Sequence, residues 1–336
     1  MSIDIGEIES GKVLIKVLTT NSVISTLLTD KKFQGKVIQP QSNASKLIAE
    51  HGLAILIEVD QGDMRKVFLL DTGGPKQTVV ENANALGVKL EDVDKLILSH
   101  GHIDHYGGFM GVLPKLKKGC EIILSPHAYD QAIILVSKSG GQISPETLSE
   151  NFRELQKQQA FKFNLKLPPL RKPLVEKLAT ENDLKIIEIS TPMKLTNGVI
   201  TSGEIEIFNE NEPTKGFYLM KSRKEFAKNT FRDEISIYFN IKDKGLIVIS
   251  GCGHTGIVNT IKHAQKLTGI DKIYAIIGGF HKEWEDPQDI EKTVKYIESL
   301  NPEITCGMHC TGFEFNKLMS RHSSNVLGIA GTEFHL

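Results

Sequence analysis

His100-Gly101-His102-Ile103-Asp104-His105 is the stretch of sequence that says most about the fold. The apolar run 96–98 precedes it and predicts a buried strand, and two glycines follow it at 107 and 108. Three imidazoles and a carboxylate therefore stand where a core strand ends and a tight loop begins. An α/β sheet usually carries its chemistry at such a position.

The spacing of these side chains predicts metal binding. Alternate side chains of an extended segment point the same way, so His100 and His102 can bind one ion together. Asp104 and His105 lie beyond the strand end, where they can face a second ion. Imidazole and carboxylate suit Zn, Mn or Fe. We therefore expect two divalent metal ions, with Zn preferred over Mn or Fe, rather than a histidine-rich surface loop.

The composition excludes several classes of protein. The chain has 336 residues, of which 40% are hydrophobic and 24% charged, and this is ordinary for a soluble globular protein. A formal net charge of −1 gives no reason to expect a nucleic acid or a membrane surface as partner. The N-terminal segment lacks the pattern of a signal peptide, and the four cysteines are too sparse for a disulfide framework. We expect a cytoplasmic protein.

Most of the chain alternates apolar strands with short helices. Strands are expected over 12–19, 53–59, 67–70, 95–98, 121–124, 234–241, 245–250, 272–277 and 304–308. Helices are expected over 76–86, 126–136, 255–267, 286–300 and up to 320.

Segment 137–183 shows no strand alternation and predicts a largely helical insertion. Lys and Arg outnumber acids in its second half, from 151 to 180, which is typical of a solvated face or, alternatively, of a mobile basic lid over an anionic substrate.

Polar side chains recur directly after the apolar strands. Asp71, His100, His254, His281 and His309 each follow such a strand. If these strands share a sheet with their ends on one side, the five side chains converge. This convergence is the main structural prediction from the sequence.

These motifs resemble the metallo-β-lactamase superfamily, whose mark is His-x-His-x-Asp-His after a strand. The flanking motifs resemble the subgroup that contains 7,8-dihydropterin-6-methyl-4-(β-D-ribofuranosyl)aminobenzene 5′-phosphate synthase. They are 49–53 (AEHGL), 71–73 (DTG), 99–102 (SHGH), 251–254 (GCGH), 278–281 (GGFH) and 309–312 (HCTG). The resemblance implies an α+β fold, an αββα sandwich of two mixed sheets, as a single domain over 1–336 with the 137–183 insertion.

The resemblance also implies a ligand set. His100, His102 and His254 would bind the first ion, and Asp104, His105 and His309 the second. His127, the only histidine between Tyr106 and Gly253, is interpreted as a non-ligand because it lies at a helix start.

Four further residues are assigned around these ligands. Cys252 stands where the superfamily has a bridging Asp, and it is a ligand or a small core residue. His281 is a ligand, a residue that holds a substrate group, or structural. Asp71 is expected behind a ligating His, with a turn Asp as the alternative. His51 is expected in the pocket wall.

Three functions remain open at this stage. The leading one is a hydrolase that acts on a phosphorylated or otherwise anionic small molecule through metal-activated water, with Asp104 and His281 as catalytic residues. The second is a transferase that joins a dihydropterin-methyl diphosphate to an arylamine ribose phosphate, as in methanopterin biosynthesis. The transferase requires aromatic side chains in the pocket wall that can stack on a flat pterin. The candidates are Tyr106, Phe109, Phe280 and Phe313, although such residues more often pack in cores. The third is a non-catalytic metal sensor or redox protein, for which Cys252 and Cys310 leave room.

Overall fold

Two large mixed sheets make up the body of the protein. The computed structural model describes residues 2–62 and 64–336, and within these residues there are sheets of eight, six and four strands. The eight-stranded sheet has the spatial order β2 (Val37–Ile38), β18 (Glu333–His335), β1 (Val13–Thr19), β3 (Ala54–Asp60), β4 (Arg65–Leu70), β5 (Lys95–Ile97), β6 (Glu121–Leu124) and β9 (Lys185–Glu188). The six-stranded sheet has the order β10 (Lys194–Thr196), β11 (Val199–Thr201), β14 (Ile237–Ile241), β15 (Gly245–Ser250), β16 (Ile273–Gly279) and β17 (Ile304–Met308).

Strand β4 shows why both faces of the first sheet are covered. Its last four residues, Val67 to Leu70, are all apolar and buried. Alternate side chains of a strand point to opposite faces. Phe68 and Leu70 accordingly join the core between the two large sheets, while Val67 and Leu69 join a second core under the helices.

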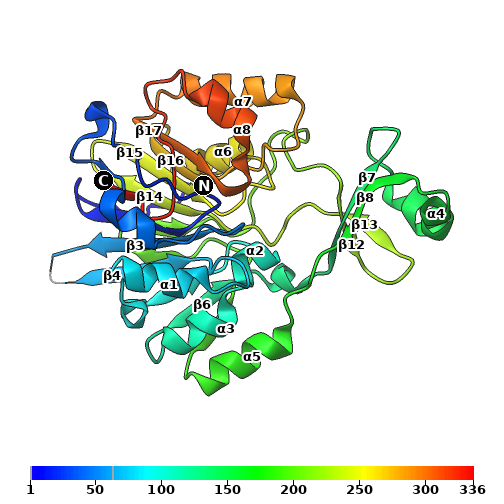
Figure 1. Ribbon diagram of the computed structural model, residues 1–336, viewed down its shortest axis with the longest axis horizontal. Helices are drawn as coiled ribbons and strands as arrows, with labels where there is room; N and C mark the ends of the chain where they lie inside the picture. Colours follow the sequence, from blue (N-terminus) through cyan, green and yellow to red (C-terminus); the bar gives the residue numbers. More distant parts are fainter. Residues whose placement is uncertain (1, 63) are drawn as a thin grey trace.

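Helices cover the outer face of each large sheet (Figure 1). Apolar residues of α1 (Thr78–Ala85), α3 (Phe109–Val112) and α5 (Lys172–Glu181) pack on the eight-stranded sheet. Those of α6 (Ile257–Thr268), α7 (Pro287–Ser299) and α8 (Phe313–Met319) pack on the six-stranded sheet. The arrangement is an αββα sandwich, so the predicted fold class is confirmed.

Helix α7 shows that local signals in the sequence set an element's bounds. The Asp286 side chain accepts a hydrogen bond from the Gln288 amide at 2.9 Å and caps the helix, with Pro287 in the first turn. Ile290, Val294 and Ile297 are buried on one face.

Among the described residues, no helix combines the length and the apolar character that crossing a membrane requires.

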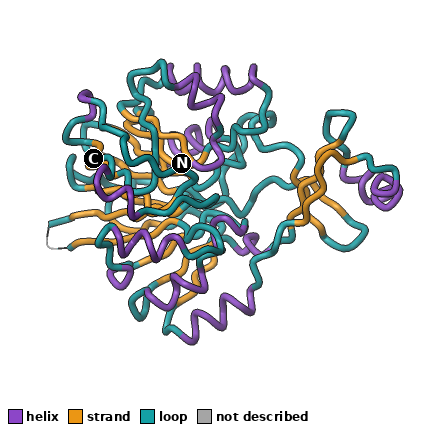
Figure 2. The backbone as a smooth tube through the Cα atoms, viewed as in Figure 1, coloured by secondary structure: helices purple, strands orange, loops and turns teal. Residues whose placement is uncertain are grey.

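A small third sheet projects from one side of the sandwich (Figures 1 and 2). Its spatial order is β13 (Phe226–Lys228), β12 (Phe217–Met220), β7 (Ala132–Ser137) and β8 (Phe161–Lys166), and α4 (Pro145–Lys157) packs against it. Its own small core contains Ile133, Leu135, Leu148, Tyr218 and Phe226.

This projecting sheet corrects two expectations. The helix expected over 126–136 is wrong: a short 3-10 helix, Pro126–Tyr129, is followed by β7, because the apolar run that begins at Ala132 is rich in β-branched residues. Segment 137–183 contains two helices, α4 and α5, in keeping with the largely helical segment expected, but it also contains a strand. Its residues 161–166 alternate apolar and polar side chains and form β8, its helix α5 packs on the sandwich, and the projecting sheet takes strands from before and after the segment.

Candidate metal centre

The strand ends of both large sheets meet at one edge of the sandwich. The loop after β5 carries His100 and His102 into the short helix α2 (Ile103–Tyr106), which holds Asp104 and His105. Loops after β15, β16 and β17 bring His254, His281 and His309 to the same place. The structure therefore brings the predicted site residues together.

Three buried imidazoles form a first cluster, which we call cluster 1: His100, His102 and His254. Nε2 of His100 lies 3.0 Å from Nδ1 of His102, and Nε2 of His254 lies 3.1 Å from the same atom. The outer nitrogen of His100 lies 2.9 Å from the Ser99 hydroxyl, which leaves Nε2 facing inward. These are the three residues that the sequence assigned to one ion.

Asp104, His105 and His309 form cluster 2. Nε2 of His309 lies 3.1 Å from Nε2 of His105 and 3.2 Å from a carboxylate oxygen of Asp104. His51 stands at its rim, where Nε2 lies 3.5 Å from the same Asp104 oxygen and the side chain is 70% exposed. His51 lines the cavity, and one of its ring nitrogens also lies within 4.8 Å of possible donor atoms of Asp104 and His309.

Asp71 lies behind cluster 2 and fixes the orientation of His105. One carboxylate oxygen accepts from Nδ1 of His105 at 2.6 Å and from the Ser99 hydroxyl at 2.7 Å, and the other accepts from the Ser99 amide. A carboxylate that holds the outer N–H of a histidine directs the lone pair of the inner nitrogen into the site. The partners of Asp71 lie on another segment of the chain, so a turn Asp that only bonds its own backbone is excluded.

Two residues that the sequence did not single out hold other histidines in place. The Asn21 amide reaches both His51 and His309, with its oxygen 3.2 Å from Nδ1 of His309. The buried carboxylate of Glu234 accepts from the backbone amides of His254 at 2.8 Å and Thr255 at 2.7 Å. An acidic residue at the expected start of a buried strand was the available signal for Glu234.

The electrostatic environment leaves the imidazoles of cluster 1 neutral. Burial, together with neighbouring imidazoles, holds the pKa of His100 and of His254 well below the usual range. Burial lowers the pKa of His102 to about 4. A metal binds the neutral form of histidine. The lone pairs are therefore free for an ion at neutral pH.

Cluster 2 carries opposite charges. Burial works against ionisation of Asp104, but His105 and His309 hold the pKa of its carboxyl well below the usual range. Burial also disfavours the charged form of His105, yet the carboxylates of Asp71 and Asp104 raise its pKa. Asp104 therefore remains an anion that can bind a cation.

The donor set fits two transition-metal ions. Nitrogens bound at 2.0–2.1 Å to a tetrahedral ion are roughly 3.3 Å apart. The separations of 3.0–3.1 Å in cluster 1 are close to that value. In both clusters the inner nitrogens face one another, while Ser99, Asp71 and Asn21 hold outer nitrogens. Zn, Mn or Fe would be held by this set, with cluster 1 as one site and cluster 2 as the other.

His281 lies beside cluster 1, with its ring centroid 4.2 Å from that of His254. Burial, followed by the nearby His102, lowers the pKa of His281 to about 3. Nδ1 of His281 is buried, and no hydrogen-bond partner for it exists among the described residues.

Nδ1 of His127 pairs with the Asp130 carboxylate at 3.3 Å, in keeping with the interpretation of His127 as a non-ligand.

A cavity of about 590 Å³ opens over both clusters, and the projecting sheet forms its far wall. Ile134 of β7, Phe163 and Leu165 of β8, Phe217 and Trp284 line it. A second cavity of about 870 Å³ adjoins it, since Phe163 and Trp284 line both. Lys162 and Lys215 stand in the wall of the second cavity.

The aromatic residues of this wall differ from those expected. Phe109 and Phe280 are buried in the helix-covered cores, and Phe313 is 71% exposed. The Tyr106 hydroxyl donates to the carbonyl of Pro168. Phe163, Phe217 and Trp284 line the cavity instead. Their place could not be inferred from the sequence because the strands that carry the two phenylalanines were not expected.

Asp71→Asn tests the support behind cluster 2. The amide cannot accept all the hydrogen bonds that the carboxylate accepts, so His105 loses its fixed orientation. We expect metal affinity at cluster 2 to fall by about 10- to 100-fold. Titration of the metal-free protein against a chromophoric chelator should then show one site near its original affinity and one weakened. Equal weakening of both sites would contradict this role.

The chain belongs to the metallo-beta-lactamase superfamily, whose family model matches residues 48–119. It is 33% identical over 270 residues to the 7,8-dihydropterin-6-methyl-4-(beta-D-ribofuranosyl)-aminobenzene-5′-phosphate synthase of Methanocaldococcus jannaschii, covering 79% of this chain and 82% of that protein. An uncharacterised protein of the same organism is 27% identical over 88% of this chain and 97% of its own length.

Two solved structures share the fold. Tm1679, described as a metal-dependent hydrolase of the beta-lactamase superfamily, has a TM-score of 0.67 at 23% identity and covers 96% of this chain and 99% of its own. Zn²⁺-bound PqqB from Methylobacterium extorquens has a TM-score of 0.51 at 9% identity, covering 96% of this chain and 100% of its own.

Proposed function

We propose that this protein is a metal-dependent transferase that joins a dihydropterin-methyl diphosphate to an arylamine ribose phosphate. The observation that carries the proposal is the aromatic wall over the metal clusters, where Phe217 and Trp284 stack at an interplanar angle of 24°. The synthase of M. jannaschii, at 33% identity, supports the same assignment.

The cavities suit two flat, phosphorylated substrates. Aromatic side chains stack on flat rings, and Phe163, Phe217 and Trp284 present such faces beside the clusters. Lys162 and Lys215 lie in the adjoining cavity, where ammonium groups can bind a phosphate. We therefore place the dihydropterin over the clusters and the ribose phosphate toward the lysines.

The reaction forms a C–N bond and breaks a C–O bond. The amine nitrogen attacks the methylene carbon, the diphosphate leaves with the C–O electron pair, and the amine loses a proton. Bound divalent ions would supply Lewis acidity to the leaving diphosphate. His281 lines the cavity and stays neutral, so its imidazole can accept a hydrogen bond from the amine and orient it, while the proton itself passes to solvent. The apolar side chains of Ile134 and Leu165 would exclude water that competes with the amine.

A hydrolase that acts on a phosphorylated or otherwise anionic small molecule is the second candidate. It is favoured by the position of Asp104, which lines the cavity and places a carboxylate oxygen 3.2 Å from His309. A carboxylate there could orient an attacking water. The same cavity and the same metal clusters would serve it.

A product assay separates the two candidates. The purified, metal-loaded protein is incubated with the dihydropterin-methyl diphosphate and the arylamine ribose phosphate. The proposal predicts release of diphosphate together with an equal amount of coupled product. Absence of coupled product, together with turnover of simple phosphodiesters or lactones, would reject the transferase and support the hydrolase.

Trp284→Ala tests the stacking wall. Its indole is 58% exposed and contacts both Phe163 and Phe217, so its removal costs little stability but takes away one aromatic face. We expect KM for the dihydropterin substrate to rise roughly 10-fold, since an aromatic pair contributes about 0.5–1.5 kcal/mol beyond its buried area. Trp284→Phe should recover most of the affinity. An unchanged KM in Trp284→Ala would exclude a stacking role.

A further inference from the structure

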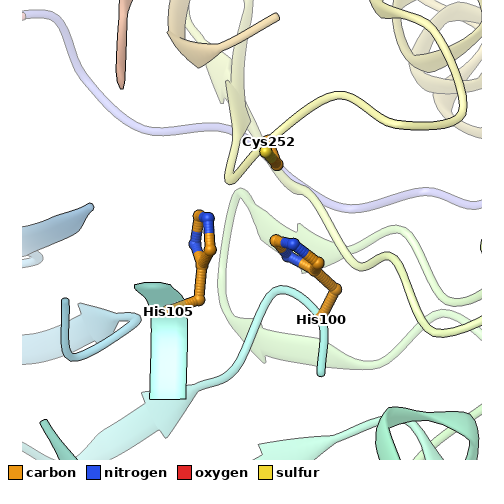
Figure 3. Close-up of side chains that lie close together, drawn as sticks. All are labelled: His100, His105 and Cys252. Carbon is orange, nitrogen blue, oxygen red and sulfur yellow. The ribbon is translucent and has the colours of Figure 1, made fainter. Parts of the chain in front are cut away.

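A thiol lies in the middle of the metal centre, between the two clusters. Cys252 follows β15, where the superfamily resemblance leads one to expect a bridging carboxylate, and it is 2% exposed. Its sulfur and one ring nitrogen each of His100 and His105 all lie within 4.8 Å of one another. Figure 3 shows the two rings side by side with Cys252 facing them. His100 belongs to cluster 1 and His105 to cluster 2, so a single sulfur is in reach of both sites.

The backbone holds Cys252 in this place. A Cβ atom on Gly251 would overlap the Ser99 side chain. Gly253 has a positive φ of 74°, and a Cβ there would lie 2.9 Å from the carbonyl oxygen of Gly279. The loop therefore passes close between the strand ends of β5 and β16, and glycine on each side of Cys252 permits the approach.

An anionic ligand at this position would also suit the charge of the centre. Cluster 1 offers neutral imidazoles, and Asp104 is the carboxylate among the residues of the two clusters. Two divalent ions would thus leave a buried excess of positive charge, which is costly in an interior. A cysteine sulfur that binds such ions would supply a negative charge.

Cys310 is the neighbour of Cys252 in this loop cluster. Its sulfur lies 2.9 Å from that of Cys252 and donates to the Cys252 carbonyl oxygen at 3.2 Å. The Cys310 sulfur also lies within 4.8 Å of the Cys252 sulfur and of a ring nitrogen of His309, so a second, terminal thiolate is the alternative that the variants below test.

We propose that the Cys252 thiolate bridges the two metal ions, one held by cluster 1 and the other by cluster 2. Cys310 supports it through hydrogen bonds and is not a ligand. The proposal rests on the two-metal centre of the proposed function and not on the identity of the substrate.

Zinc-edge X-ray absorption of the di-zinc protein tests the bridge. A bridging thiolate gives each zinc a sulfur neighbour at about 2.3 Å, hence about one sulfur per zinc. A thiolate on one ion only gives about half a sulfur per zinc, and a non-ligating Cys252 gives none. Either of those two results would overturn the proposal, as would a protein that takes up no zinc.

Variants distinguish one bridging sulfur from two terminal ones. Cys310→Ser should keep about one sulfur per zinc, whereas two terminal thiolates would fall to about half. Cys252→Asp should keep two zinc ions and lose the sulfur signal, and the Co(II)-loaded form should lose its near-ultraviolet thiolate-to-metal absorption band. Cys306 is a buried cysteine of the core between the two large sheets, and Cys306→Ser is the matched control. This variant should keep the sulfur neighbour of zinc and the Co(II) absorption band. Because these readouts need no turnover, a failed transferase assay leaves them interpretable.

Discussion

Replacement of His102 by alanine is expected to abolish turnover and to remove one bound metal ion while the fold persists. Nδ1 of His102 lies 3.0 Å from His100 and 3.1 Å from His254, so its loss takes away one of three donors of cluster 1. Since a bound metal supplies several kcal/mol of transition-state stabilisation, the rate should fall by more than about a thousandfold. Elemental analysis and steady-state rates measure both effects.

His127→Ala is the matched control for this substitution. His127 also follows a strand and an apolar run, but its ring nitrogen pairs with Asp130. This variant should keep two metal ions and nearly full activity. If His102→Ala kept its full metal content, the assignment of cluster 1 would be wrong.

Replacement of Gly278 by alanine is expected to lower the free energy of unfolding by about 3 kcal/mol or more. Gly278 lies in β16, pairs with Ser250 of β15 and has a φ of 131°. A Cβ there would overlap the Ser250 carbonyl oxygen, a backbone atom that can move only by breaking the strand pair. Urea unfolding followed by circular dichroism measures the loss.

Gly119→Ala separates the clash from the backbone strain. Gly119 has a positive φ of 77° but nothing within 4 Å of the position of a Cβ. Strain alone should cost about 1–2 kcal/mol. Equal losses in the two variants would show that close packing of the strand ends does not matter.

The sequence predicts where the imidazoles gather because they follow apolar strands. A strand with a continuous apolar run can be recognised without the rest of the fold, as β15 and β16 illustrate. Parallel neighbours in a sheet end on one side, so donors such as His254 and His281 must converge. The αββα sandwich was implied by the superfamily motifs, and the apolar runs are only compatible with it.

The projecting sheet could not be predicted in this way. Its strands come from two parts of the chain, β7 and β8 from one and β12 and β13 from the other. A short strand is stabilised by the strand with which it pairs. Local sequence does not indicate which distant segment that partner strand will be. The wall residues Phe163 and Phe217 were missed for that reason.

Residues that orient the ligands were only partly predictable. Asp71 follows a strand and was expected behind a histidine, as the structure shows. Asn21 lies in a loop with no periodicity, and its contacts with His51 and His309 depend on tertiary structure alone. A single polar residue in a loop carries no sequence signal for such a role.

The central claim is that the gathered imidazoles hold two metal ions, and anomalous diffraction at the zinc edge tests it most directly. Crystals of the zinc-loaded protein should show two anomalous peaks. One should lie about 2.0–2.1 Å from nitrogens of His100, His102 and His254, and the other at a similar distance from His105 and His309. If crystals grown with zinc gave a map that lacks the peak at cluster 1 or the peak at cluster 2, that map would contradict the account.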